Sequence, residues 1–262
     1  MQTSHLVKER EKSLTFTELA DAHCHLDLIP DRELINAAIR GGVRTIVTDG
    51  VDTKSNALCA QMADGKNIYA AMGIDPEHSG IEDEELEFNI GMIRANPSKI
   101  CAIGEIGLDY AKGRVNVEIE RQKKVFGAFL DLAVELGKPV TIHSREAMED
   151  VLAMLEEREV KGAHMHFFEG GPTEAKRIEK LGYMISVPPF ESSRRNKAIV
   201  AIAIDNIMAE SDSPAAGATP LDVSKSVGIV AKAKGISFER AAEQLTANTK
   251  RFFNVGFKSM MR

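Results

Sequence analysis

The sequence contains no tryptophan, only three cysteines and only seven histidines in 262 residues. Because Cys24, Cys59 and Cys101 are odd in number and lack any paired spacing, they do not form a disulfide framework. Small buried thiols in a reducing compartment account for them, and this predicts a cytoplasmic protein.

Long apolar runs are also missing. No run approaches the ~20 residues that span a bilayer. The first residues, MQTSHLVKEREKSLTF, are charged and lack the apolar centre of a secretion signal. We therefore expect no membrane contact and no secretion, and we interpret residues 1–18 as a polar N-terminal extension.

Basic residues are fewer than acidic residues. The net charge is −6 and the sequence pI is about 5.7, which argues against a general nucleic-acid coat with a basic stripe. An enzyme that meets phosphates through metal ions and a few local cations remains compatible with this balance. The most notable basic cluster holds Arg194, Arg195 and Lys197, which we interpret as the solvated face of a helix start.

Strand-like and helix-like segments alternate along nearly the whole chain. Eight short β-branched or apolar runs occupy residues 19–27, 43–49, 68–74, 100–108, 139–144, 162–168, 183–189 and 206–212. Amphipathic segments lie between them, and the longest covers residues 118–138.

Eight such pairs predict a single-domain α/β protein with a (β/α)8 TIM barrel over residues 19–262. A doubly wound open sheet is the rival architecture, but no G-x-G-x-x-G follows the first strand. In a (β/α)8 barrel, side chains at the C-terminal ends of different strands converge on one site.

The stretch DAHCHLD places His23 and His25 one strand repeat apart, so both imidazoles point to the same side. Such a pair can chelate one ion, although a polar strand end is the more common explanation when the pair is taken alone. Five of the seven histidines lie at predicted strand ends, which packing does not explain.

Chemically active residues end four other strands. Glu105 lies between apolar residues, where a carboxylate is costly unless it is paired or bound to metal. The remaining residues are His143 and Arg145 in strand five, His164 and His166 in strand six, and Glu210 and Asp212 in strand eight. This set of nitrogen and oxygen ligands predicts a site for one or two divalent ions. We interpret His164 as a hydrogen-bonded core residue. Glu210 either holds a ligand imidazole or is satisfied inside the barrel.

The stretches DAHCHLD, AIGEIGLDY, TIHSREA, HFFEGG and ESDSP resemble, in this order, the TatD-type metal-dependent deoxyribonucleases among the amidohydrolase-like barrels. The resemblance runs from about residue 20 to residue 253, and Gln122 and Phe126 also match the family. It implies a cytoplasmic hydrolase that cleaves phosphodiester bonds in DNA through a metal-activated water. The sequence does not indicate a protein partner.

The resemblance also implies residue roles. Two divalent ions, whose identity among Zn, Mn, Mg, Fe and Co stays open, have six ligands: His23, His25, Glu105, His143, His166 and Asp212. Glu105 bridges the ions and Asp212 accepts the proton of the attacking water, so both count as catalytic. Arg145 contacts a substrate phosphate.

The rim departs from the family pattern. A histidine that the family carries after strand three is replaced by Asp75 in GIDPEH, and Glu169 stands where a small serine is usual. We assign Asp75 to substrate binding. The altered rim leaves open a metal-dependent amidohydrolase, esterase or lactonase acting on a small non-nucleic-acid substrate. A non-catalytic metal-stabilised scaffold is the third alternative.

Overall fold

A computed structural model describes residues 17–256. The predicted extension over residues 1–18 lies almost wholly outside the described residues, so its boundary with a domain over 19–262 stays a prediction. Among residues 17–256, no helix combines the length and the apolar character needed to cross a membrane.

All eight predicted strands are present, and they pair in parallel in chain order into one sheet. Their bounds are β1 (Leu19–Cys24), β2 (Val43–Gly50), β3 (Ile68–Met72), β4 (Ala102–Asp109), β5 (Val140–Arg145), β6 (Ala163–Met165), β7 (Met184–Val187) and β8 (Ile207–Ala209). The fold is a single (β/α)8 TIM barrel, as predicted.

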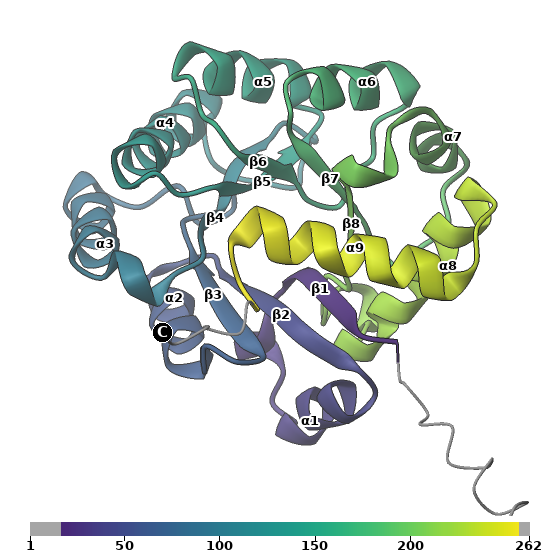
Figure 1. The fold of residues 1–262 in the computed structure, drawn as a ribbon. Coiled ribbons are helices and arrows are strands. Elements are labelled where there is room, and N and C mark those ends of the chain that lie inside the picture. Colours follow the sequence, from purple (N-terminus) through teal and green to yellow (C-terminus); the bar gives the residue numbers. More distant parts are fainter. Residues whose placement is uncertain (1–16, 257–262) are drawn as a thin grey trace, which may run out of the picture.

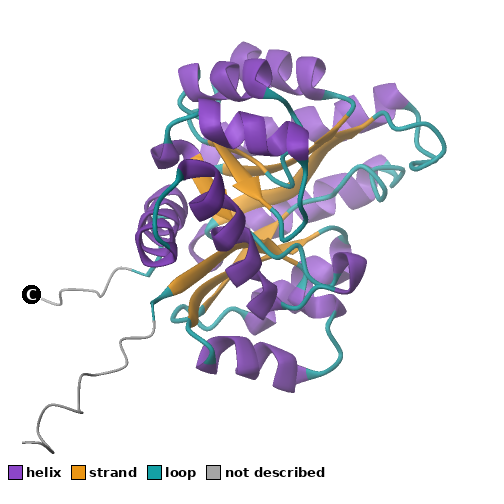
Figure 2. Ribbon diagram, turned by 90° about the vertical axis from the view of Figure 1, so that its right-hand side faces the viewer, coloured by secondary structure: helices purple, strands orange, loops and turns teal. Residues whose placement is uncertain are grey.

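Helices follow the strands and surround them (Figures 1 and 2). The α-helices are α1 (Arg32–Arg40), α2 (Thr53–Met62), α3 (Asp83–Ala95), α4 (Ile119–Leu136), α5 (Met148–Glu157), α6 (Pro172–Lys180), α7 (Ser193–Ala201), α8 (Val223–Lys234) and α9 (Phe238–Phe253). Short 3₁₀ helices are η1 (Leu26–Leu28), η2 (Pro97–Lys99), η3 (Ile204–Asn206), η4 (Ala215–Gly217) and η5 (Pro220–Asp222). The longest predicted helix corresponds to α4. It ends at Gly137, whose positive φ of 61° suits the left-handed position after a helix.

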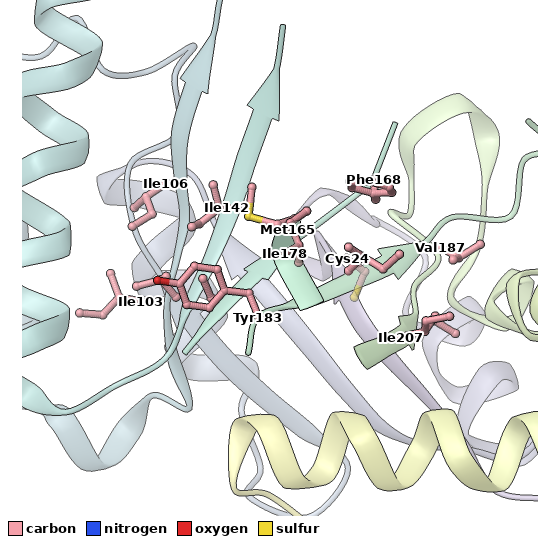
Figure 3. Packing of buried hydrophobic residues seen from close by; sticks show 14 of the residues in the cluster. Cys24, Ile103, Ile106, Ile142, Met165, Phe168, Ile178, Tyr183, Val187 and Ile207 are labelled. Carbon is pink, nitrogen blue, oxygen red and sulfur yellow. The ribbon is translucent and has the colours of Figure 1, made fainter. Parts of the chain in front are cut away.

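The core lies between the strands and the outer helices. Every residue of β4 is buried, as expected when a parallel sheet is covered by helices. Ile106, Ile142 and Met165, from three neighbouring strands, lie close together in this apolar layer (Figure 3). The three cysteines are buried free thiols, as predicted.

Helix α9 covers the N-terminal end of the barrel. The side-chain amide of Asn248 donates to the backbone carbonyl of Ile207 at the start of β8. The hydroxyl of Thr246 donates to the backbone carbonyl of Glu18 beside β1. Figure 1 shows α9, in yellow, lying across the ring of strands. The opposite, C-terminal end of the strands is the end at which (β/α)8 barrels carry their sites.

The barrel closes at that C-terminal end. Backbone hydrogen bonds run from the amide of Asp212 to the carbonyl of His23, at 3.1 Å, and from the amide of His25 to the carbonyl of Ser213, at 2.8 Å. These bonds join the segment after β8 to the end of β1, although almost the whole chain separates them. They bring two histidines and an aspartate into one place.

Several strands are shorter at their C-terminal ends than predicted. β8 ends at Ala209 rather than at residue 212, and β1 ends at Cys24, before His25. Asp212 has a left-handed backbone with φ of 51°, which no regular strand accommodates. The polar residues counted as strand ends therefore lie partly in the loops that follow.

Candidate metal centre

The six side chains predicted as ligands converge at the C-terminal ends of five strands. Three overlapping groups have ligand atoms within 4.8 Å of one another: His23, His166 and Asp212; His23, His25 and Glu105; and Glu105, His143 and His166. The rings of His23 and His166 stack with their centroids 4.0 Å apart, which links the groups into one cluster.

Glu105 lies at the middle of this cluster. Its Oε1 is 2.8 Å from Nε2 of His166 and 3.1 Å from Nδ1 of His143. Its Oε2 faces the other pair, at 3.7 Å from Nε2 of His23 and 3.5 Å from Nε2 of His25. One carboxylate therefore offers one oxygen to each of two histidine pairs.

Asp212 faces the pair formed by His23 and His25. Its Oδ1 is 3.6 Å from Nε2 of His23 and 3.7 Å from Nε2 of His25, which is too long for hydrogen bonds. His23 is fully buried, and among residues 17–256 its Nε2 has no hydrogen-bond partner. A buried unpaired imidazole nitrogen facing two carboxylate oxygens fits a divalent cation, which accepts nitrogen and oxygen ligands together.

Burial and the neighbouring charges set the ionisation of these ligands. Burial and the nearby His166 hold the pKa of His23 well below its usual range, so the ring is neutral. Burial raises the pKa of Glu105, but the imidazoles of His166 and His143 outweigh it and hold that pKa well below the usual range. A neutral imidazole and an ionised carboxylate are the states that bind metal.

Two further carboxylates stand behind the histidines. Oδ2 of Asp49, at the end of β2, lies 3.1 Å from Nδ1 of His23. Oδ2 of Asp109, at the end of β4, lies 2.9 Å from Nε2 of His143. The contact between Asp109 and His143 is a hydrogen bond, and a carboxylate in this position orients a ligand imidazole and raises its basicity. Asp49 lies close to His23 without hydrogen-bond geometry. Burial lowers the pKa of His143, but its hydrogen bonds with Asp109 and Glu105 outweigh burial and raise it to about 10. A metal ion that binds at His143 must therefore displace its proton.

Asp49 was not predicted from the sequence, and Asp109 had no predicted site role. Asp49 ends the predicted strand over residues 43–49, and Asp109 directly follows the predicted strand over residues 100–108. The criterion that selected Glu105, a carboxylate at the end of an apolar strand, would also have selected these two. The support that Asp109 gives to His143 depends on a contact between two strands.

A buried polar chain lies beside His166. Nε2 of His164 is 2.6 Å from the hydroxyl of Ser186, which donates to Oε2 of Glu210 at 2.5 Å. Oε1 of Glu210 accepts from the backbone amide of Phe167 at 2.7 Å. His164 is therefore a hydrogen-bonded core residue, as predicted. Of the two interpretations of Glu210, these contacts fit the second: its carboxylate is hydrogen-bonded inside the barrel and does not hold a ligand imidazole.

Arg145 and Asp75, the predicted substrate residues, lie at the rim. Nε of Arg145 is 3.5 Å from Oε2 of Glu169, and both side chains are partly exposed. Oδ1 of Asp75 is 2.7 Å from Nδ1 of His78. Each rim group thus has a partner of opposite charge within the protein.

Arg195 corrects the interpretation of the basic cluster. It is 3% exposed rather than solvated, and its guanidinium donates to the backbone carbonyls of Phe168 and Phe190. Its neighbours Arg194 and Lys197 have the expected exposed positions. Helix α7 begins at Ser193, so Arg195 lies in its first turn, on the face that packs inward. A charge pattern alone does not report which face of a helix is buried.

Comparisons with known proteins point in one direction. The family model described as TatD related DNase matches residues 20–254. Deoxyribonuclease TATDN3 of Homo sapiens is 28% identical over 258 residues, covering 90% of this chain and 94% of that protein. The uncharacterized metal-dependent hydrolase YabD of Bacillus subtilis is 31% identical, covering 90% of this chain and 99% of that protein.

Solved structures agree on the architecture. The crystal structure of YJJV, a TatD homolog from Escherichia coli, has a TM-score of 0.83 with 25% identity, covering 92% of this chain and 99% of that chain. Dihydroorotase from Campylobacter jejuni has a TM-score of 0.60 with 14% identity, which is a likeness of fold alone.

Proposed function

The chain belongs to the TatD related DNase family of metal-dependent hydrolases, and on this basis we propose that it is a deoxyribonuclease or exonuclease that cleaves phosphodiester bonds in DNA. The observation that carries the proposal is the division of Glu105 between two histidine pairs, with Oε1 facing one pair and Oε2 the other. This arrangement supports two adjacent divalent ions bridged by one carboxylate.

In this proposal each ion has its own ligands. His23, His25 and Asp212 would hold the first ion, His143 and His166 would hold the second, and Glu105 would contribute one oxygen to each. The donor set accepts Zn, Mn, Mg, Fe or Co, so the metal must be identified by measurement.

Two bound divalent ions lower the pKa of a shared water and stabilise negative oxygens in an in-line displacement. Asp212 would accept the proton of an attacking water through its carboxylate. Burial raises the pKa of Asp212, which makes it a better base than an exposed aspartate. Its left-handed backbone, with φ of 51°, costs free energy that the bond from its amide to the carbonyl of His23 helps to offset.

The rim residues bind the substrate. Arg145 exchanges its contact with Glu169 for a phosphate oxygen, which a guanidinium binds well. Asp75 holds His78 at the rim of the site, and the pKa of His78 is raised to about 8 because its ring N–H donates a hydrogen bond to the carboxylate of Asp75. His78 is therefore largely cationic near neutral pH and available to a phosphate.

A small-molecule amidohydrolase, esterase or lactonase is the second candidate. The observation that favours it is the acidic rim, where Asp52, Asp75 and Glu169 surround the two cations His78 and Arg145. A non-catalytic scaffold is disfavoured because the two residues assigned to the chemistry, Glu105 and Asp212, are both present.

The testing experiment follows nucleotide release from a single-stranded DNA oligomer. Chelator-stripped protein is assayed with Mg²⁺, Mn²⁺ or Zn²⁺ added back, and Asp212→Asn protein is prepared identically to exclude a contaminating nuclease. We expect metal-dependent release that falls by about 10²- to 10⁴-fold in the variant. Release of no nucleotide with any metal, together with hydrolysis of simple lactones or cyclic amides, would favour the second candidate. The cytoplasmic location stays a prediction.

A further inference from the structure

The backbone of Phe167 is unusual. Its φ is 44°, in the left-handed region that bulky residues rarely adopt. Phe167 directly follows His166 in the loop after β6. Such a conformation persists only where surrounding contacts fix it, and it often marks a functional position.

Two buried polar side chains fix Phe167. Its amide donates to the fully buried carboxylate of Glu210 at 2.7 Å. The guanidinium carbon of the buried Arg195 lies 5.8 Å from the centre of the Phe167 ring, which suits a cation–π contact. Both the backbone and the ring of Phe167 are therefore held in place.

The ring that is held so firmly is not part of the core. Phe168, the next residue, is 1% exposed and packs in the core, whereas Phe167 and Phe190 are only partly buried. The rings of Phe167 and Phe190 have centroids 6.0 Å apart and are tilted by 33°. The Phe167 ring lies 6.5 Å from that of His166, at the edge of the metal centre.

Arg195 connects the two phenylalanines. Its guanidinium also donates to the backbone carbonyl of Phe190, so one buried cation holds a ring of one loop and the backbone of the next. The two aromatic residues therefore form a preorganised pair beside the metal centre.

We propose that Phe167 and Phe190 form a stacking site for the nucleobase next to the scissile phosphate. The inference rests on the proposed nuclease function, because it assigns a binding site to a nucleobase of the DNA strand that is cleaved. Aromatic side chains stack on any base, since every base has a π face, and this suits binding without sequence preference. The short distance to His166 places the stacked base within one nucleotide of the phosphate bound at the metal centre.

The test compares intact and base-free substrates. Wild-type, Phe190→Leu and Phe167→Leu proteins are assayed on a single-stranded oligomer and on oligomers with one abasic nucleotide on either side of the cleaved bond. Phe88→Leu, on the exposed surface of α3, is the matched control. We expect each of the two variants, Phe190→Leu and Phe167→Leu, to raise KM for the intact oligomer about tenfold. On one of the two abasic oligomers, each variant should have the same KM as wild type.

A second readout does not depend on turnover. Metal-stripped protein in chelator is titrated into an oligomer that carries 2-aminopurine at the stacking position. We expect wild-type protein and Phe88→Leu to quench its fluorescence, and Phe190→Leu to lose most of the quenching.

The outcomes separate the two proposals. Equal KM increases on intact and both abasic oligomers indicate a packing role and overturn the stacking site. Unchanged KM in a nuclease that cleaves the oligomer overturns the stacking site alone. If wild-type protein neither cleaves the oligomer with any metal nor quenches 2-aminopurine, the nuclease function and the stacking site both fail. Quenching without cleavage supports the stacking site and overturns the hydrolysis.

Discussion

Asp109 and His143 are joined by a contact of 2.9 Å between Oδ2 of the carboxylate and Nε2 of the ring. The other ring nitrogen, Nδ1, faces Glu105. Asp109 is itself fixed, because its Oδ1 accepts from the amide of Ala111 and its amide donates to the side chain of Gln122. The imidazole is thus held on one side by a support and presented on the other to the metal centre.

Replacing Asp109 should weaken metal binding. Asp109→Asn removes the negative charge behind His143 and should lower metal affinity by about 10- to 100-fold. The measurement is calorimetric titration of Mn²⁺ or Zn²⁺ into chelator-stripped protein. Asp131→Asn, an exposed aspartate paired with Arg158, is the control and should leave the affinity unchanged. Equal affinity in Asp109→Asn and wild type would remove the supporting role.

Metal should stabilise the fold through His23. A divalent ion at 100 times its Kd should add about 2.7 kcal/mol to the free energy of unfolding, so Tm should rise on adding Mn²⁺ to stripped protein. His23→Gln should lose most of this increase, because it removes the buried nitrogen that faces Glu105 and Asp212. His78→Gln, outside the centre, should keep it. An undiminished Tm increase in His23→Gln would contradict the ligand assignment.

Freeing Arg145 should improve substrate binding. Glu169→Gln removes the carboxylate that lies 3.5 Å from Arg145. Exposed ion pairs contribute up to about 1 kcal/mol, so KM for an oligonucleotide should fall by up to about fivefold with kcat little changed. Glu135→Gln, which breaks the remote pair with Arg94, provides the control. A KM that does not fall would show that Glu169 does not compete for Arg145.

The His78–Asp75 pair should make stability depend on pH. The hydrogen bond that the ring of His78 donates to Asp75, aided by the charges of Asp52 and Glu77, raises the pKa of His78 from 6.5 to about 8. The protonated pair therefore stabilises the fold fully below about pH 6.5, and this contribution is lost as the pH rises through about 8. Since His78 is 41% exposed, solvent screening keeps the contribution below about 1 kcal/mol.

The comparison is between wild type and His78→Asn in urea unfolding at about pH 6 and about pH 9. His78→Asn should be destabilised more at the lower pH than at the higher one. A difference between the proteins that is the same at both pH values would show that the pair contributes no pH-dependent stability.

The local pattern of the chain was enough for the architecture. Alternation of short apolar runs and amphipathic segments predicted all eight strands, because each strand and helix of this barrel buries a face whose periodicity is written in its own residues. Strand order needed no further information, since consecutive β/α pairs lie side by side. The ligand set could be predicted because scarce histidines and costly carboxylates stood at strand ends.

Strand ends themselves were less predictable. His25, His166 and Asp212 lie just beyond their strands, because the chain leaves the sheet where side chains turn toward the site. The sequence pattern also placed Arg195 in solvent, whereas the inward face of α7 buries it under Phe167.

By itself, then, the sequence determined the barrel and the residues capable of binding metal, because both follow from local periodicity and residue chemistry. Only the tertiary structure decided how they act together. The closure of β8 onto β1 joins Asp212 to His23, and the pairing of β4 with β5 sets Glu105 and Asp109 on either side of His143. Those relationships depend on contacts between residues far apart in the chain, which no local pattern encodes.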